Sequence, residues 1–132
     1  MGRARTLIAT IAAASAVSMM TASPVAAQGP SVLRLAPGDG CPDDYVCLFG
    51  GPSFSEGGYA VHSRSAVNDF QALYFNDEMT SWINATRYYY CWYQHAEYIG
   101  VGFVMSPHSA LSEEPASRNN TAASLQECPF DT

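Results

Sequence analysis

The sequence contains no lysine, and clustered positive charge is absent throughout. All twelve acidic residues lie after position 27, where only four scattered arginines oppose them, so this part of the chain has a net charge of −8. Those arginines are Arg34, Arg64, Arg87 and Arg118. Nucleic acids and anionic lipids bind surfaces with clustered Lys or Arg, so the composition argues against both as partners.

Signals of common hydrolases are also missing. The chain has no G-x-S-x-G elbow, and its three histidines, His62, His95 and His108, form no His-x-x-x-His pair of the zinc-peptidase type. We expect the adjacent carboxylates Asp43-Asp44 and Glu113-Glu114 to face solvent rather than to act as an acid and base pair. The sequence therefore predicts a protein that is not an enzyme.

The one long apolar stretch, Leu7 to Met20, lies at the N-terminus. It follows Arg3 and Arg5 and precedes the small residues Ser23 to Ala27, the order of a secretory signal peptide cleaved after Ala27. A membrane anchor is the alternative, but the stretch is shorter than the roughly 20 residues that span a bilayer. We predict a signal peptide over residues 1–27, a secreted, extracellular protein, and no membrane association after cleavage.

The part after the signal peptide is expected to be one small monomeric domain. Residues 28–40 hold two prolines and three glycines with little apolar periodicity, which predicts a flexible leader. Order is expected to begin near Cys41, so the domain spans residues 41–132.

The four cysteines of this short exported chain indicate two disulfides, for which three connectivities exist. We favour Cys41 with Cys47, which closes a small ring. Cys91 would then pair with Cys128 and tie the C-terminal tail to the second half of the domain.

An internal repeat organises the domain. Six residues recur at a constant offset of 44 positions: Cys47-Leu48-Phe49, Phe54 and Gly58-Tyr59 return as Cys91-Trp92-Tyr93, Tyr98 and Gly102-Phe103. The ends match as well, because Asn76–Ser81 resembles Asn119–Ser124 with an offset of 43. One supersecondary unit has been duplicated, with copies at about 41–86 and 87–128.

Short aromatic and β-branched runs between turn signals predict strands and no long helix. The strands are expected at Tyr45–Phe49, Tyr59–His62, Trp82–Asn84, Tyr88–Tyr93 and Ile99–Met105. Single helical turns fit Ser65–Leu73 and Ser109–Ser117. The fold class is all-β, a sandwich of two Greek keys in which Ile99, Val101, Phe103 and Met105 share one face.

The aromatic run Tyr88–Tyr93 could serve as a platform for a carbohydrate or a peptide. Strand alternation buries about half of its side chains. We assign Tyr89 to the core and place a binding edge at Trp92 with Gln94 and His95, which leaves a sugar-binding module as a further option.

The second copy resembles the opening of a βγ-crystallin Greek key, which has an aromatic residue, another five positions later and a glycine two after that. Tyr93, Tyr98 and Gly100 match this pattern. The first copy has Phe49 and Phe54 but places Glu56 at the glycine.

The resemblance has two further implications for the corners. Gly57 or Gly58 would take over the tight backbone position of the missing glycine. Ser81 and Ser124 are implied as the serines that brace the two corners.

With its signal peptide, its acidic composition and the segment Cys41–Phe49 that contains the small ring, the chain also resembles secreted bacterial peptidase inhibitors of the Streptomyces metalloproteinase inhibitor type. The resemblance covers Cys41 to Cys128 and implies a βγ-crystallin-like inhibitor of extracellular metallo- or other endopeptidases. In that family the inhibitory segment is a small loop closed by a disulfide. Here no cysteine follows Cys91 until Cys128, so the inhibitory residues remain unassigned.

Asn76–Ser81 fits the calcium signature of microbial βγ-crystallins. Ca²⁺ prefers six to eight oxygen ligands, and the resemblance implies Asn76, Asp77 and Thr80 from the first copy with Asn119 and Asn120 from the second. In the second copy Ala123 replaces the hydroxyl ligand. The alternative to a calcium site is a polar turn. The alternative to the inhibitor function is a calcium-binding βγ-crystallin-like protein with a structural, stress or antimicrobial role.

Overall fold

The computed structural model describes residues 31–130, so the predicted signal peptide lies outside the described residues. Eight strands and three short 3-10 helices make up this part of the chain. The strands are β1 (Val32–Leu35), β2 (Tyr45–Phe49), β3 (Gly58–His62), β4 (Ser81–Asn84), β5 (Tyr90–Tyr93), β6 (Phe103–Met105), β7 (Ser109–Leu111) and β8 (Ser124–Glu127). The 3-10 helices are η2 (Pro52–Phe54), η3 (Phe70–Leu73) and η4 (Ala96–Tyr98). Among the described residues 31–130, no helix has the length and apolar character needed to cross a bilayer.

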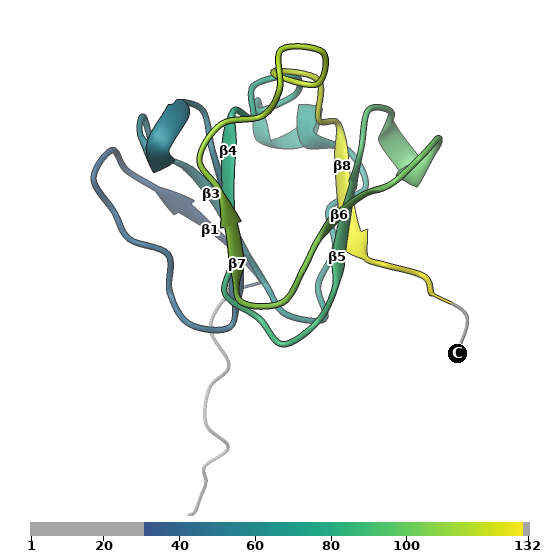
Figure 1. The fold of residues 1–132 in the computed structure, drawn as a ribbon, viewed down its shortest axis with the longest axis horizontal. Coiled ribbons are helices and arrows are strands. Elements are labelled where there is room, and N and C mark those ends of the chain that lie inside the picture. The colour runs from purple at the N-terminus through teal and green to yellow at the C-terminus, as the bar shows by residue number, and fades with distance from the viewer. Residues whose placement is uncertain (1–30, 131–132) are drawn as a thin grey trace, which may run out of the picture.

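The strands form two antiparallel sheets that stand opposite each other (Figure 1). One has five strands in the order β1-β3-β2-β4-β7, and the other has three in the order β6-β5-β8. The copies exchange an element, because β7 of the second copy pairs with β4 of the first, while Val67 of the first copy bridges Leu125 in β8. The predicted all-β sandwich of two Greek keys is confirmed.

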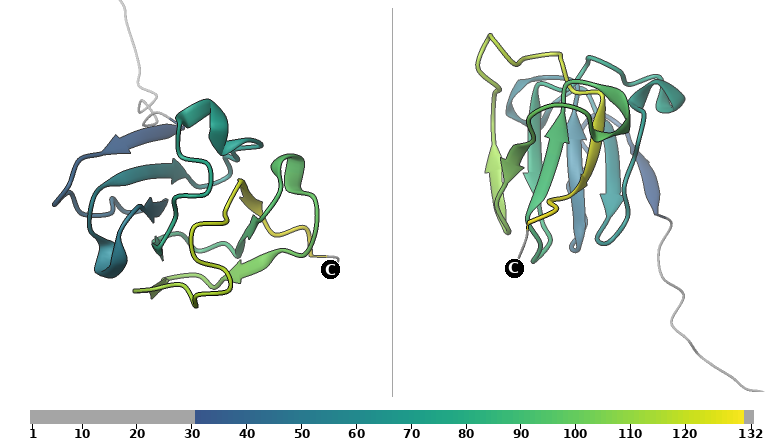
Figure 2. Two further views of the ribbon diagram at one scale, coloured as in Figure 1. Left: turned by 90° about the horizontal axis from the view of Figure 1, so that it is seen from above. Right: turned by 90° about the vertical axis from the view of Figure 1, so that its right-hand side faces the viewer.

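Seen from above, the two sheets face each other (Figure 2, left). Apolar side chains from both sheets pack together in one core. Trp92 and Phe103 stack with ring centroids 4.5 Å apart. A smaller cluster, including Phe49 and Phe54, lies under the Cys41 ring. Both favoured disulfides, Cys41–Cys47 and Cys91–Cys128, are present.

The predicted orientation of the aromatic strand is wrong by one residue. Tyr90 and Trp92 are buried and Tyr89 is 47% exposed, so Trp92 belongs to the core rather than to a binding edge. Successive side chains of a strand point to opposite faces, and a shift of one residue exchanges the whole set. The predicted strand Tyr88–Tyr93 is otherwise found as β5.

The predicted flexible leader is wrong for Val32–Leu35, which forms β1 and pairs with β3. Order therefore begins before Cys41. Four residues with three large aliphatic side chains are enough to extend an existing sheet, whereas Pro37, Gly38 and Gly40 belong to the turn that follows.

Two further boundaries differ from the prediction. Of Ile99–Met105, only Phe103–Met105 is strand, because the backbone turns at Gly100 (φ +101°) and leaves Ile99 and Val101 exposed. The helical turn expected at Ser109–Ser117 is not found at its start, because Ser109–Leu111 forms the strand β7. The helical turn expected within Ser65–Leu73 is found as η3 (Phe70–Leu73).

Candidate functional site

Each copy folds over at a corner that a serine braces. In the first copy, Ser81 Oγ accepts a hydrogen bond from the Phe54 amide (3.0 Å) and donates one to the Gly51 carbonyl (2.6 Å). Phe54 stacks on Phe49 with ring centroids 5.8 Å apart. Glu56 itself has a left-handed backbone (φ +67°), as does Gly57 after it, so the missing glycine is not simply displaced by one position.

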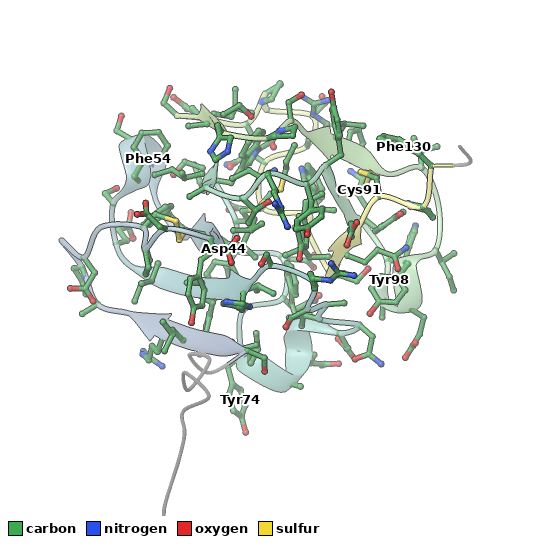
Figure 3. The ribbon with its side chains drawn as sticks, turned by 90° about the horizontal axis from the view of Figure 1, so that it is seen from below. Asp44, Phe54, Tyr74, Cys91, Tyr98 and Phe130 are labelled. Carbon is green, nitrogen blue, oxygen red and sulfur yellow. A yellow bond between two sulfur atoms is a disulfide. The ribbon has the colours of Figure 1, made fainter. Side chains whose placement is uncertain are left out.

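The second corner repeats this arrangement. Ser124 Oγ accepts from the Tyr98 amide (3.1 Å) and donates to the His95 carbonyl (2.6 Å). Tyr98 stacks on Tyr93 with ring centroids 6.0 Å apart. The corners lie on opposite sides of the molecule, as Phe54 and Tyr98 show in Figure 3, and the implied role of both serines is confirmed.

The two polar motifs meet between the copies. The Asp77 amide donates to the Ala122 carbonyl (3.0 Å), and the Asn120 amide donates to the Met79 carbonyl (3.0 Å). These bonds correspond under the offset of 43 residues. The repeat therefore brings the candidate calcium residues of both copies to one place.

The first motif supplies an oxygen-rich cleft. Thr80 Oγ1 lies 3.2 Å from the Gly50 carbonyl oxygen and 3.1 Å from Asn120 Oδ1. Thr80 itself is buried, whereas Gly50, Asn120 and the exposed Asp77 and Glu78 line a cleft beside it. One hydroxyl, one amide and one carbonyl beside carboxylates suit a hard cation, so the residues of this first site fit Ca²⁺.

The second motif does not fit. Ala123 provides no hydroxyl, and Asn119 Oδ1 is buried without a hydrogen-bond partner in the described part of the chain. Asn76 is exposed. Among residues 31–130, no cluster of three or more His, Cys, Asp or Glu side chains could hold a metal.

The expectation that Glu114 faces solvent is wrong, because only 3% of it is exposed. Its carboxylate accepts a hydrogen bond from Trp82 Nε1 (3.0 Å) and lies 3.2 Å from Arg118 Nε. The Arg118 guanidinium also lies over the Phe103 ring, 4.9 Å from its centroid. This group braces the loop from β7 to β8, which rises above both sheets in Figure 1. Its one signal in the sequence was Trp82, whose indole N–H needs an acceptor when buried.

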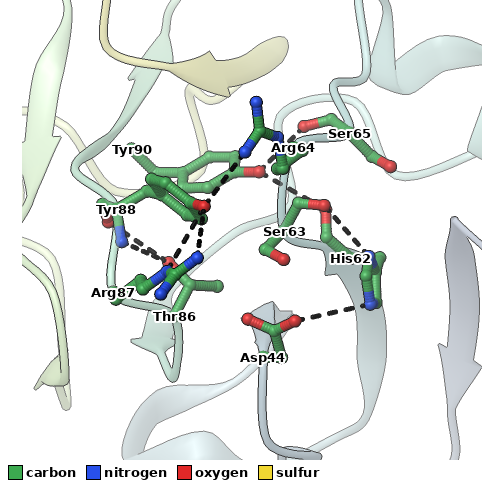
Figure 4. Close-up of polar contacts among 9 residues, drawn as sticks. All are labelled: Asp44, His62, Ser63, Arg64, Ser65, Thr86, Arg87, Tyr88 and Tyr90. Carbon is green, nitrogen blue, oxygen red and sulfur yellow. Dashed lines mark hydrogen bonds and ion pairs between the residues drawn. The ribbon is translucent and has the colours of Figure 1, made fainter.

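A second polar group, around Tyr88, lies on the surface (Figure 4). Arg64 and Arg87 donate hydrogen bonds to the Tyr88 hydroxyl, at 3.2 Å from Arg64 Nη1 and 3.2 Å from Arg87 Nη2. Hydrogen bonding from Arg87 and then Arg64 lowers the pKa of Tyr88. Burial raises the pKa of the neighbouring Tyr90 to about 12. We find no nucleophile and base arranged for catalysis in this group.

Comparison with known proteins identifies the family. The model of peptidase inhibitor family I36 matches residues 36–105, which is more than half of the chain. The chain belongs to peptidase inhibitor family I36. Among curated proteins, none matches the sequence.

Two solved structures share the fold of this family I36 protein. One, described as "Evolution of the eye lens beta-gamma-crystallin domain fold", is 19% identical with a TM-score of 0.64 and covers 76% of this chain and 100% of its own. The other, a beta gamma crystallin from Ciona intestinalis, is 17% identical with a TM-score of 0.53 and covers 64% of this chain and 99% of its own. The βγ-crystallin-like fold is thereby confirmed.

Membership of family I36 makes the protein a peptidase inhibitor domain rather than an enzyme, and its partner is a peptidase. Two disulfides in a domain of this size are consistent with an extracellular protein.

Proposed function

We propose that this family I36 protein is a secreted, monomeric inhibitor of extracellular endopeptidases, with metallopeptidases as the first target class. The family match over residues 36–105 carries the proposal. The predicted signal peptide and the acidic, lysine-free composition support export, and the first target class follows from the resemblance to the Streptomyces metalloproteinase inhibitor type.

The scaffold supports this function physically. An inhibitor binds tightly when its binding segment is ordered before the peptidase arrives, because little conformational entropy is then lost on binding. Both corners are held by buried serine hydrogen bonds, and both ends of the domain are closed by disulfides.

Titration of the secreted protein against thermolysin-like, subtilisin-like and trypsin-like enzymes tests the proposal. We expect stoichiometric inhibition of at least one of these enzymes, and the thermolysin-like enzyme is the first candidate. The inhibitor should stay intact during the titration. The reduced and heat-denatured protein serves as the control and should be digested. Native protein that inhibits none of the three and is slowly digested would contradict the proposal.

Calcium binding is a second candidate function, favoured by the neighbouring oxygens of Thr80, Gly50 and Asn120. These three oxygens lie close together beside acidic side chains, whereas the second motif lacks the hydroxyl. We therefore propose one weak site rather than a pair. Bound Ca²⁺ would neutralise the carboxylates of Asp77 and Glu78 and tie the two copies together.

A thermal melt tests the calcium site. With about 10 mM Ca²⁺ and a Kd of ~1 mM, binding stabilises the folded state by about 1.4 kcal/mol, which raises Tm by several degrees. Asp77→Asn should remove the rise, because asparagine tolerates the left-handed backbone at this position (φ +61°) but carries no charge. The control Glu113→Gln removes an exposed carboxylate outside the candidate site and should retain the rise in Tm with Ca²⁺. An unchanged wild-type midpoint would rule out the site.

A further inference from the structure

The two copies differ in what lies beside their second strand. In the first copy, β1 pairs antiparallel with the outer edge of β3, with Leu35 opposite Gly58 and Val32 opposite Val61. The corresponding strand of the second copy is β6, which is the last strand of its sheet. No strand of residues 31–130 covers its outer edge.

The residue that precedes this edge also differs between the copies: it is Gly57, two positions before Tyr59, in the first copy and Val101, two positions before Phe103, in the second. Gly57 is buried, and a Cβ there would collide with the Leu35 carbonyl oxygen of the covering chain. Its counterpart 44 positions later is Val101, which is 78% exposed. A large aliphatic side chain thus occupies the position at which the first copy leaves room for a neighbouring strand.

The segment that forms the open edge has no charged residue of its own. Proteins commonly protect exposed strand edges with charged residues, and Arg34 provides one on β1. From Tyr98 to Pro107 the chain has no charged residue, although the domain is strongly acidic. Ile99, Val101 and Val104 are 61%, 78% and 49% exposed, so this segment is both uncharged and accessible.

The segment is nevertheless held at both ends. On one side the Tyr98 amide is bonded to Ser124 Oγ, and on the other Phe103 stacks on the buried Trp92. Within residues 31–130, no backbone hydrogen bond involves Ile99, Gly100 or Val101. The outer edge of β6 (Phe103–Met105) is open because β6 is the last strand of its sheet, and the unbonded residues next to it leave room for a partner, while the ends of the segment are already fixed.

We propose that the target peptidase binds here: an extended backbone segment of its substrate cleft pairs with the outer edge of β6, as β1 pairs with β3, and an aliphatic subsite receives Val101. This inference rests on the proposed inhibitory function and names its site. The β1–β3 register, carried over by 44 positions, places the pairing along Gly102–Met105. Peptidase clefts commonly hold peptides as extended strands, and such pairing combines main-chain hydrogen bonds with side-chain pockets.

Substitutions on this edge test the site against the peptidase that the wild-type protein inhibits. Val104→Lys adds a charge to the edge, and Val101→Gly restores the residue type of the first copy. We expect each to raise the inhibition constant at least about tenfold, the effect of losing about 1.4 kcal/mol of binding. The matched control is Ala110→Lys, at an exposed position of β7, the outer strand of the other sheet. This variant should change the inhibition constant less than about twofold. Thermal midpoints of all variants show whether they fold.

Amide hydrogen exchange of the wild-type protein provides a measurement that needs no variant. Bound peptidase should protect residues 101–105, whereas protection confined to residues 50–57 or 112–118 would overturn the site. Wild-type inhibition that both edge variants retain would also overturn it, while failure of the wild-type protein to inhibit any peptidase would count against the proposed function itself. A concentration-dependent dimer that Val104→Lys abolishes would show that a second copy of this chain, not a peptidase, occupies the edge.

Discussion

Replacing Glu114 with alanine will lower the free energy of unfolding by about 3 kcal/mol or more. Glu114 is 3% exposed and holds the Trp82 indole N–H and the Arg118 guanidinium at once. Removal of the carboxylate leaves the buried Trp82 N–H without its acceptor and the partly buried Arg118 guanidinium without its counter-ion, and each loss adds to the cost. The loop from β7 to β8 also loses its side-chain link to Trp82 in β4, while the backbone bond from the Glu114 amide to the Thr80 carbonyl remains (2.7 Å).

Urea unfolding of three variants separates these contributions. Glu113→Ala changes the exposed neighbour and should stay within about 0.5 kcal/mol of the wild-type value. Glu114→Gln keeps an acceptor for Trp82 but loses the charge beside Arg118, so its stability should lie between the wild-type and alanine values. A Glu114→Ala protein as stable as Glu113→Ala would show that the buried pair contributes nothing.

The repeat allowed the architecture to be predicted because it records local requirements. An aromatic stack such as Phe49 on Phe54 needs residues five positions apart, and the tight corner beside it needs a serine from a distant strand. The cysteine pairs could be predicted as well, because each disulfide lies within one copy: Cys41–Cys47 in the first and Cys91–Cys128 in the second. These features depend on spacing, and spacing is visible in a sequence.

The remaining features depend on contacts between distant segments. Which face of β5 is buried is determined by the opposite sheet and by the Cys91–Cys128 disulfide on the other face, so Tyr89 and Tyr90 could not be distinguished from alternation alone. Glu114 is buried because Trp82 and Arg118 lie around it; Arg118 is only four positions away, but Trp82 lies on a distant strand, so the sequence spacing does not indicate the burial. For the same reason the open edge at Val101 became visible only once β1 was found to cover the equivalent edge of the first copy.

The Cys91→Ala/Cys128→Ala double variant will lose about 3.9 kcal/mol of stability, because the loop that this disulfide closes is long and constrains the unfolded chain strongly. The bridge spans 37 positions and connects β5 with the tail that follows β8. Without it, the Tyr89–Phe130 ring contact (5.5 Å between centroids) and the Cys128 amide bond to the Tyr89 carbonyl (2.8 Å) hold the tail alone. For a domain whose total stability is expected to be about 5–15 kcal/mol, this is a large share.

The Cys41→Ala/Cys47→Ala variant is the matched control, because it removes the same chemical groups from a loop of 6 positions and should lose only about 2.4 kcal/mol. Thermal and urea unfolding measure both values, and digestion by a peptidase that the protein does not inhibit provides a second readout. Since cleavage follows the population of open states, the Cys91→Ala/Cys128→Ala variant should be digested faster than the control. Equal losses from the two variants would show that loop entropy does not set the stabilisation, and that strain or residual structure in the unfolded chain dominates instead.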